Sequence, residues 1–305
     1  MATRHNWLRK SNWHLYLAIS PFFILFGIFG IGPLFYAGWL SLHRWNGLSD
    51  PVFVGFDQFV RLVRDGAFLD ALITTVMIFV MAQIPLVIGA LAAAATLAQL
   101  RGRARAFYQT ALFVPQITSL VMVAIVFQSL FSGSYGVVNR MLGSLGFPVI
   151  DWLVDWWGIK WVIAFMVIWR GFGYFMVIFL AGLSSISPSL YDAAKMDGAG
   201  PIRTFWSITL PLLRPTIVFV VIISSIGGLQ LFTEPQVLFN GLGGPNNAGR
   251  TIMLLQYQYL GSTLGAASLP DLGYATTISI ATFVILLVVS LTQARFLRRS
   301  LTIEE

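Results

Sequence analysis

The chain has 305 residues, of which 57% are hydrophobic and only 10% are charged, and its mean hydropathy is +0.79. Soluble domains carry roughly a quarter charged residues, so this composition excludes an ordinary soluble protein and predicts an all-α integral membrane protein. The formal net charge of +7 does not indicate nucleic-acid binding, because the basic residues lie scattered at the ends of apolar segments. Cysteine is absent and the three histidines lack metal-ligand spacing, so no metal site is expected.

Six apolar segments are long enough to cross a bilayer as helices, since a span needs about 20 mostly apolar residues. We expect them at residues 16–42, 71–100, 106–131, 161–183, 216–237 and 274–292. The first segment is too long for a cleaved signal peptide, and no small-residue cleavage site follows it. Four tryptophans between 152 and 161 fit the aromatic belt at a membrane interface. The whole chain, 1–305, is therefore expected to form one transmembrane domain.

The distribution of basic residues predicts the orientation of these spans. With both termini placed inside, 12 Lys and Arg residues lie on the cytoplasmic side and 6 on the outer side. Short cytoplasmic loops carry an excess of Lys and Arg. We therefore expect a six-helix bundle with both termini in the cytoplasm.

The longest polar interruption that keeps helical character is the cytoplasmic loop 187–215, between the fourth and fifth spans. Pro188 suits the first position of a helix, where no amide donor is needed. Gly198 can end this helix in a left-handed conformation, and Pro201 can begin a second short helix. Pro211 is then expected to break helicity before the next apolar segment. The loop is predicted to form two short helices joined by a glycine turn.

The same loop contains Asp192-Ala193-Ala194, then Gly198, Ile208 and Leu210-Pro211. This pattern resembles the EAA loop of bacterial ABC-importer permeases, in which Glu-Ala-Ala is followed after three residues by Gly, after nine more by Ile, and after one more by Leu-Pro. Every spacing matches, and Asp192 replaces the usual Glu. Five further stretches resemble the carbohydrate branch of that family: 54–59, 113–115, 135–139, 243–245 and 273–275.

The resemblance implies the transmembrane architecture of a type I ABC importer in a bacterial inner membrane, similar to maltose, glycerol-phosphate and lactose permeases. Such a subunit would form half of the pathway for a di- or oligosaccharide. Its expected partners are a second homologous permease, a dimer of cytoplasmic ATPases, an extracytoplasmic sugar-binding protein and membrane lipid. ATP and magnesium would bind the ATPase, and no cofactor is expected in this chain. The residues expected to meet the ATPase are Asp192, Ala193, Ala194 and Gly198.

Ionisable residues inside spans are informative, because a charge at the bilayer centre costs about 2.5–3.5 kcal/mol and such residues usually face a bundle interior. Arg170 and Glu234 are the two placed within the predicted spans, at depths that differ by roughly 10 Å. They are expected to form a mutual ion pair or to face a sugar in the pathway; alternatively, Glu234 is exposed at the outer mouth. Tyr174 and Gln230 are further pathway candidates, although interhelical hydrogen bonding is an alternative role for glutamine. The same alternative applies to Gln83, Gln116 and Gln128.

No catalytic motif is present: we find neither His-Glu-x-x-His nor Gly-x-Ser-x-Gly, and no P-loop, so an enzyme is not predicted. The alternative function is a secondary transporter driven by an ion gradient. Such transporters favour inverted repeats and buried carboxylates. The sequence shows no clear repeat, and Glu234 is the only carboxylate inside a predicted span.

Overall fold

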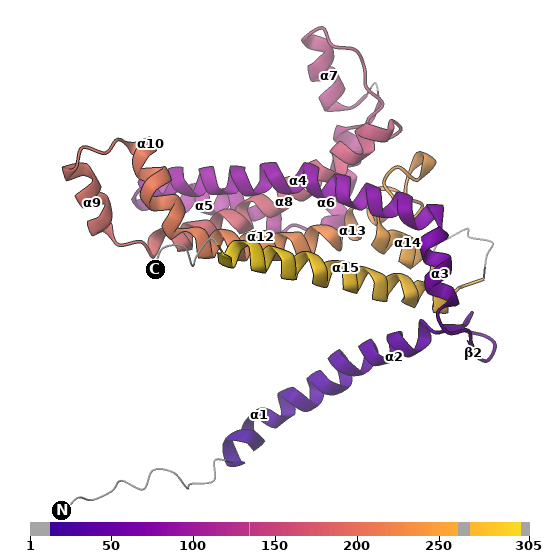
Figure 1. Ribbon diagram of the computed structural model, residues 1–305. Coiled ribbons are helices and arrows are strands. Elements are labelled where there is room, and N and C mark those ends of the chain that lie inside the picture. The colour runs from indigo at the N-terminus through magenta and orange to yellow at the C-terminus, as the bar shows by residue number, and fades with distance from the viewer. Residues whose placement is uncertain (1–12, 134, 262–268, 300–305) are drawn as a thin grey trace, which may run out of the picture.

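The computed structural model describes residues 13–133, 135–261 and 269–299 (Figure 1). Within these ranges, five helices are long and apolar enough to cross a membrane, and a sharply bent pair makes a sixth if it counts as one span. The predicted cytoplasmic location of the two termini concerns residues 1–12 and 300–305, which lie outside the described residues. The described part of the chain is a helical membrane protein with one two-stranded ribbon.

The first span diverges from the rest of the molecule (Figure 1). It runs over Tyr16–Leu40, and none of its most apolar stretch is buried against this chain. Its segments are α1 (Trp13–Phe26), the π-helical η1 (Gly27–Ile31) and α2 (Gly32–Leu40). A ribbon of β1 (His43–Arg44) and β2 (Val52–Phe53), antiparallel with His43 opposite Phe53, then leads to α3 (Asp57–Arg64).

Four long helices run side by side and form the body of the bundle (Figure 1). They are α4 (Gly66–Gln99), α8 (Trp156–Ser184), α12 (Arg214–Leu229) and α15 (Leu272–Arg299). Ala90 and Ala94 of α4 are fully buried against large α8 side chains such as Phe179. Small residues let membrane helices approach closely, and this is how the two longest helices pack.

The third span is not the single helix that residues 106–131 predicted. It consists of α5 (Gly102–Ile117) and α6 (Leu120–Leu130), which meet at an angle of 95°. Thr118 and Ser119 between them have extended or turn backbone angles, three residues after Pro115. Pro115 lacks the N–H that would bond the Ala111 carbonyl, which weakens the last turn of α5 just before the bend. The bend is fixed by packing of the apolar face of α6, including Val123 and Phe127, onto α8.

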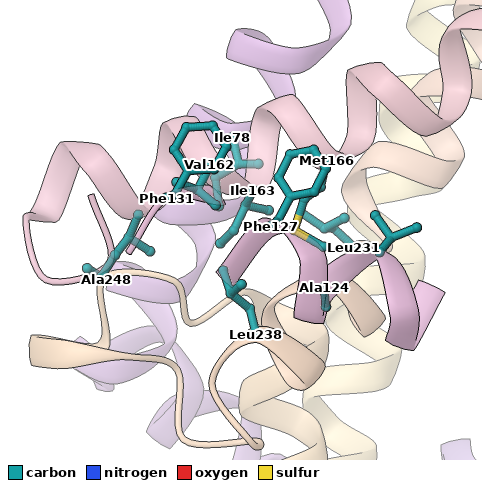
Figure 2. Close-up of a cluster of buried hydrophobic side chains, with 12 residues drawn as sticks. Ile78, Ala124, Phe127, Phe131, Val162, Ile163, Met166, Leu231, Leu238 and Ala248 are labelled. Atoms are coloured by element: carbon teal, nitrogen blue, oxygen red, sulfur yellow. The ribbon is translucent and has the colours of Figure 1, made fainter. Parts of the chain in front are cut away.

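A buried cluster joins the outer part of the bundle (Figure 2). Phe127 and Phe131 stack on each other with centroids 5.7 Å apart. Around them lie Ile78 of α4, Met166 of α8 and Leu238 from the end of the fifth span. Side chains from distant parts of the sequence thus fix the positions of the helices that surround the functional site.

The fifth span is also interrupted. Its helices are α12 (Arg214–Leu229) and α13 (Thr233–Leu238), and Gln230 between them has left the helical conformation. The outer connection contains η3 (Pro245–Asn247) and α14 (Ile252–Tyr259). Lys160, one of the six basic residues assigned above to the outer side of the membrane, is fully buried in α8. Its Nζ donates to the Ala248 carbonyl at 2.8 Å and lies 3.4 Å from the centre of the Trp156 ring, which ties α8 to this connection.

Candidate functional site

A cavity of about 360 Å³ lies between α4, α8, α12 and the α12–α13 break. All four pathway candidates from the sequence line it: Arg170, Tyr174, Gln230 and Glu234. Gln83 and Gln116 line it as well, and the remaining wall is largely apolar. The cavity thus combines apolar walls with a few convergent polar groups, the usual composition of a small-molecule site.

Arg170 and Glu234 are closer than their sequence positions suggested. Arg170 Nη1 lies 3.7 Å from Glu234 Oε1, with the two side chains 35% and 10% exposed. The interruption after Leu229 redirects the chain, so Glu234 in the first turn of α13 reaches the level of Arg170. The structure therefore contains the ion pair and also places both groups on the cavity wall. An exposed position of Glu234 at the outer mouth was wrong, because this residue is buried.

The geometry of the pair leaves hydrogen-bonding capacity unused. The Nε of Arg170 is buried and has no hydrogen-bond partner in the described residues. At 3.7 Å the contact to Glu234 is an ion pair but exceeds the length of a normal hydrogen bond. Buried polar groups are normally hydrogen-bonded, so these two charges can take a ligand's hydroxyl groups as additional partners.

The amides of the spans divide into two kinds. Gln128 Nε2 donates to the Leu238 carbonyl at 2.6 Å, and Gln128 does not line the cavity. Its role is therefore the interhelical hydrogen bond that was one of the two alternatives from the sequence. Gln83 bonds the Ser224 hydroxyl on α12 but also lines the cavity. The same bond thus links α4 to α12 and holds an amide at the cavity wall.

Sequence reasoning found Tyr174 but missed other aromatic residues of the cavity wall. Phe79 and Phe232 line the cavity, and a Cβ at Gly228 would come within 2.7 Å of the Phe79 ring. The Gly227-Gly228 pair was the available signal, because adjacent glycines inside a span indicate close approach of another group. Trp169 of α8 does not line the cavity and instead lies against Phe127, with ring centroids 6.1 Å apart.

The second candidate region is the elbow, defined here as α9 (Pro188–Met196) and α10 (Pro201–Thr204) with the turn between them. Gly198 has φ +73°, and its N–H donates to the Lys195 carbonyl at 3.0 Å. The N–H of Ala199 donates to the Ala194 carbonyl at 2.9 Å. These two bonds form a Schellman motif, which ends a helix at a left-handed glycine. The predicted turn is confirmed.

The four motif residues of the elbow differ in accessibility. Asp192, Ala193 and Gly198 are exposed, whereas Ala194 is buried at 5% relative exposure. Ala194 therefore packs inside the elbow, and only Ala193 offers the small surface expected of both alanines. Asp192 forms an exposed ion pair with Lys195 at 3.4 Å. No atom of the described residues lies within 4 Å of a Cβ built at Gly198, so among them the space beside the turn is open.

The elbow is joined to the fifth span by almost continuous helix, so the predicted break at Pro211 was wrong. After α10 come the π-helical η2 (Phe205–Thr209), α11 (Leu210–Leu212) and α12, and Leu213 between the last two keeps a right-handed helical backbone. The N–H of Leu210 bonds the Phe205 carbonyl, five residues back. A π-helical turn accommodates a locally altered hydrogen-bond ladder, and here it directly precedes the proline. η1 precedes Pro33 in the same way.

Comparisons with known proteins agree with this architecture. The model of the family described as binding-protein-dependent transport system inner membrane component matches residues 59–301. The lactose transport system permease protein LacF of Rhizobium radiobacter is 38% identical over 279 residues, which cover 90% of each chain. The arabinooligosaccharides transport system permease protein AraP of Halalkalibacterium halodurans is 32% identical, over 91% of this chain and 85% of its own length.

A solved structure shows the same fold. A chain of a bacterial alginate ABC transporter, crystallised in complex with an alginate pentasaccharide-bound periplasmic protein, matches with a TM-score of 0.75. It is 26% identical, and the match covers 95% of this chain and 96% of that one. The family model spans most of the sequence, including the elbow and every cavity-lining helix. This chain belongs to the family of binding-protein-dependent transport system inner membrane components.

Proposed function

We propose that this chain is the permease subunit of an ATP-driven importer for a carbohydrate, with a di- or oligosaccharide as substrate. The observation that carries the proposal is the cavity, in which an Arg170–Glu234 pair and several amides line an otherwise apolar wall. Charged and amide groups match the many hydroxyls of a sugar, and Tyr174 offers an aromatic surface. The named relatives transport lactose and arabinooligosaccharides, and the structural neighbour belongs to an alginate transporter.

The elbow is proposed as the contact for a separate ATPase, with Asp192, Ala193 and Gly198 at the contact surface. Ala194 supports this contact surface from inside, because Ala194 is buried in the elbow. The nearly continuous helix from Pro201 to Leu229 gives this contact a mechanical path to the cavity. It ends at Gln230, which lines the cavity four residues before Glu234. Displacement of the elbow would therefore move one wall of the cavity.

The remaining partners follow from the same proposal. ATP and magnesium would bind the ATPase dimer, since this sequence contains no P-loop. A second permease would complete the pathway, and the first span offers it an apolar surface that this chain does not cover. An extracytoplasmic sugar-binding protein would deliver the substrate, and both termini would lie in the cytoplasm. The family match favours this mechanism over the ion-gradient-driven transporter that the sequence left open.

The test is uptake into proteoliposomes that contain the purified assembly, its binding protein and internal ATP, with radiolabelled lactose, maltose and arabinobiose as probes. We expect ATP-dependent uptake of at least one probe, and its loss when the partner ATPase carries a substitution that abolishes hydrolysis. Uptake that persists without ATP and instead follows an imposed proton or sodium gradient would contradict the proposal.

A further inference from the structure

The segment between α6 and α8 forms a projecting arm, defined here as residues 131–133 and 135–155, and α7 (Val137–Ser144) is its helix. Asn139 organises it and is only 3% exposed. Its Nδ2 donates to the carbonyls of Gly133 and Ile150, at 2.7 Å each. Its Oδ1 accepts the N–H of Ile150 at 3.2 Å and of the Trp152 indole at 3.1 Å. One buried amide thus closes the arm, so the surface that the arm presents is built by its own hydrogen bonds.

The exposed surface of α7 is divided into an apolar and a polar stripe. The apolar stripe consists of Val137, Met141 and Leu145, which are four residues apart and are 43%, 64% and 73% exposed. Residues at this spacing lie on one side of a helix. Arg140 and Ser144, also exposed, form the neighbouring polar stripe. An exposed surface that is half apolar and half polar suits a boundary between water and an apolar medium.

The arm begins at the level where the membrane interface is expected. Trp156 and Trp157, 40% and 53% exposed, follow it directly at the start of α8, and tryptophan prefers the headgroup region. The 29 residues of α8 extend over about 43 Å, whereas the hydrocarbon core is about 30 Å thick, so the ends of α8 reach the interfaces. Figure 1 shows α7 standing away from the bundle, across the direction of α4 and α15. Because α4 and α15 cross the membrane, a helix that runs across their direction lies along the membrane plane.

We propose that the arm is an interfacial anchor whose apolar stripe enters the outer leaflet of the phospholipid bilayer. Arg140, the only basic residue between 131 and 155, is complementary to the lipid phosphates. Phe147 and Val149, 59% and 58% exposed, extend the apolar surface beyond the helix.

The chain contains no cysteine, so single-cysteine labelling tests this directly. Met141→Cys carries an environment-sensitive fluorophore on the apolar stripe, and Ser144→Cys, three residues further on the polar stripe, is the matched control. The full assembly is placed in nanodiscs that contain phosphatidylglycerol and lipids spin-labelled near the headgroup. We expect the lipid quencher to reduce the Met141→Cys signal at least threefold more than the Ser144→Cys signal. Aqueous iodide should show the opposite preference.

Two outcomes overturn the proposal. Equal access of iodide to both labels would mean that the arm stands free in water. Protection of the Met141→Cys label from both quenchers would mean that a protein covers the stripe. Leu145→Cys provides a second position on the same stripe if the first variant does not assemble. Each labelled variant is compared only if it co-purifies with the same partners as the unlabelled chain.

Discussion

The cavity and the elbow each contain one ion pair, and the longer of the two pairs is the less exposed one. The elbow pair, Asp192–Lys195, measures 3.4 Å but both side chains are more than 70% exposed. The cavity pair, Arg170–Glu234, measures 3.7 Å, and the Glu234 side chain is 10% exposed. Because water screens the exposed pair, the longer, buried pair has the larger consequences when one partner is removed.

The two regions also depend on different parts of the sequence. The elbow is made by consecutive residues, with a helix that begins at Pro188 and a turn at Gly198. The cavity is made by residues from α4, α8, α12 and α13, held at their positions by packing. Changes in the elbow should therefore affect coupling while leaving the fold intact. Changes at the packing contacts around the cavity should affect the fold itself.

Gly173→Ala is expected to have the largest effect. A Cβ at this position would lie 1.9 Å from the Leu112 carbonyl oxygen, so α5 and α8 would have to separate. Overpacking against backbone costs about 3 kcal/mol or more, and we expect a clear loss of thermal stability together with all uptake. Gly227→Ala is the matched control in α12, because its Cβ would meet nothing within 4 Å. Equal stability of the two variants would contradict the close crossing of α5 and α8.

Gly198→Asp should abolish coupling but not folding. We expect uptake to fall at least tenfold while the melting temperature changes by no more than about 3 °C, because only the local turn is strained. Gly198→Asn separates two causes, since asparagine tolerates a positive φ better than most residues. If backbone strain causes the loss of uptake, the asparagine variant should retain most of the uptake. If the loss arises because a side chain fills the space that receives the ATPase, the asparagine variant should lose uptake as well. Wild-type uptake in the aspartate variant would count against the elbow as the coupling site.

Arg170→Gln leaves Glu234 buried without its charged partner. We expect a loss of about 2 kcal/mol in the free energy of unfolding and about a tenfold loss of uptake. The double variant Arg170→Gln/Glu234→Gln removes the unpaired charge, so it should recover stability but not uptake. Recovery of both would show that the pair is purely structural and takes no part in transport.

Lys195→Ala should have the smallest effect. It removes the exposed pair with Asp192, and such pairs contribute at most about 1 kcal/mol. We expect the unfolding midpoint in denaturant to stay within experimental error of the wild type. A loss as large as that of Arg170→Gln would show that burial does not distinguish the two pairs.

Local sequence signals were sufficient to predict the backbone of the elbow but not the arrangement of the cavity. Gly198 and Pro201 specify a turn and a helix start from their own backbone preferences, and both lie where expected. Pro211 misled because a proline was assumed to end helicity, whereas the π-helical turn before it accommodates the missing donor. The accessible face of the elbow was not predictable either, because the burial of Ala194 depends on folding of the loop.

The positions that sequence reasoning missed depend on tertiary packing. Six apolar segments were recognisable, but the bend between α5 and α6 depends on packing of α6 against α8. The ion pair of Arg170 and Glu234 was among the expectations, but the interruption after Leu229 that brings Glu234 to the level of Arg170 was not. The burial of Lys160 was not predictable from the sequence either, because its ammonium is held by the Ala248 carbonyl and the Trp156 ring, which only the fold brings together.

Crosslinking from two adjacent positions can show whether the elbow contacts a separate ATPase. Because the chain lacks cysteine, Ala193→Cys and Ala194→Cys can each carry a short photoactivatable crosslinker. We expect a crosslinked ATPase from exposed position 193 and little or none from buried position 194. Equal crosslinking from both positions, or none from position 193 in an actively transporting assembly, would contradict this expectation.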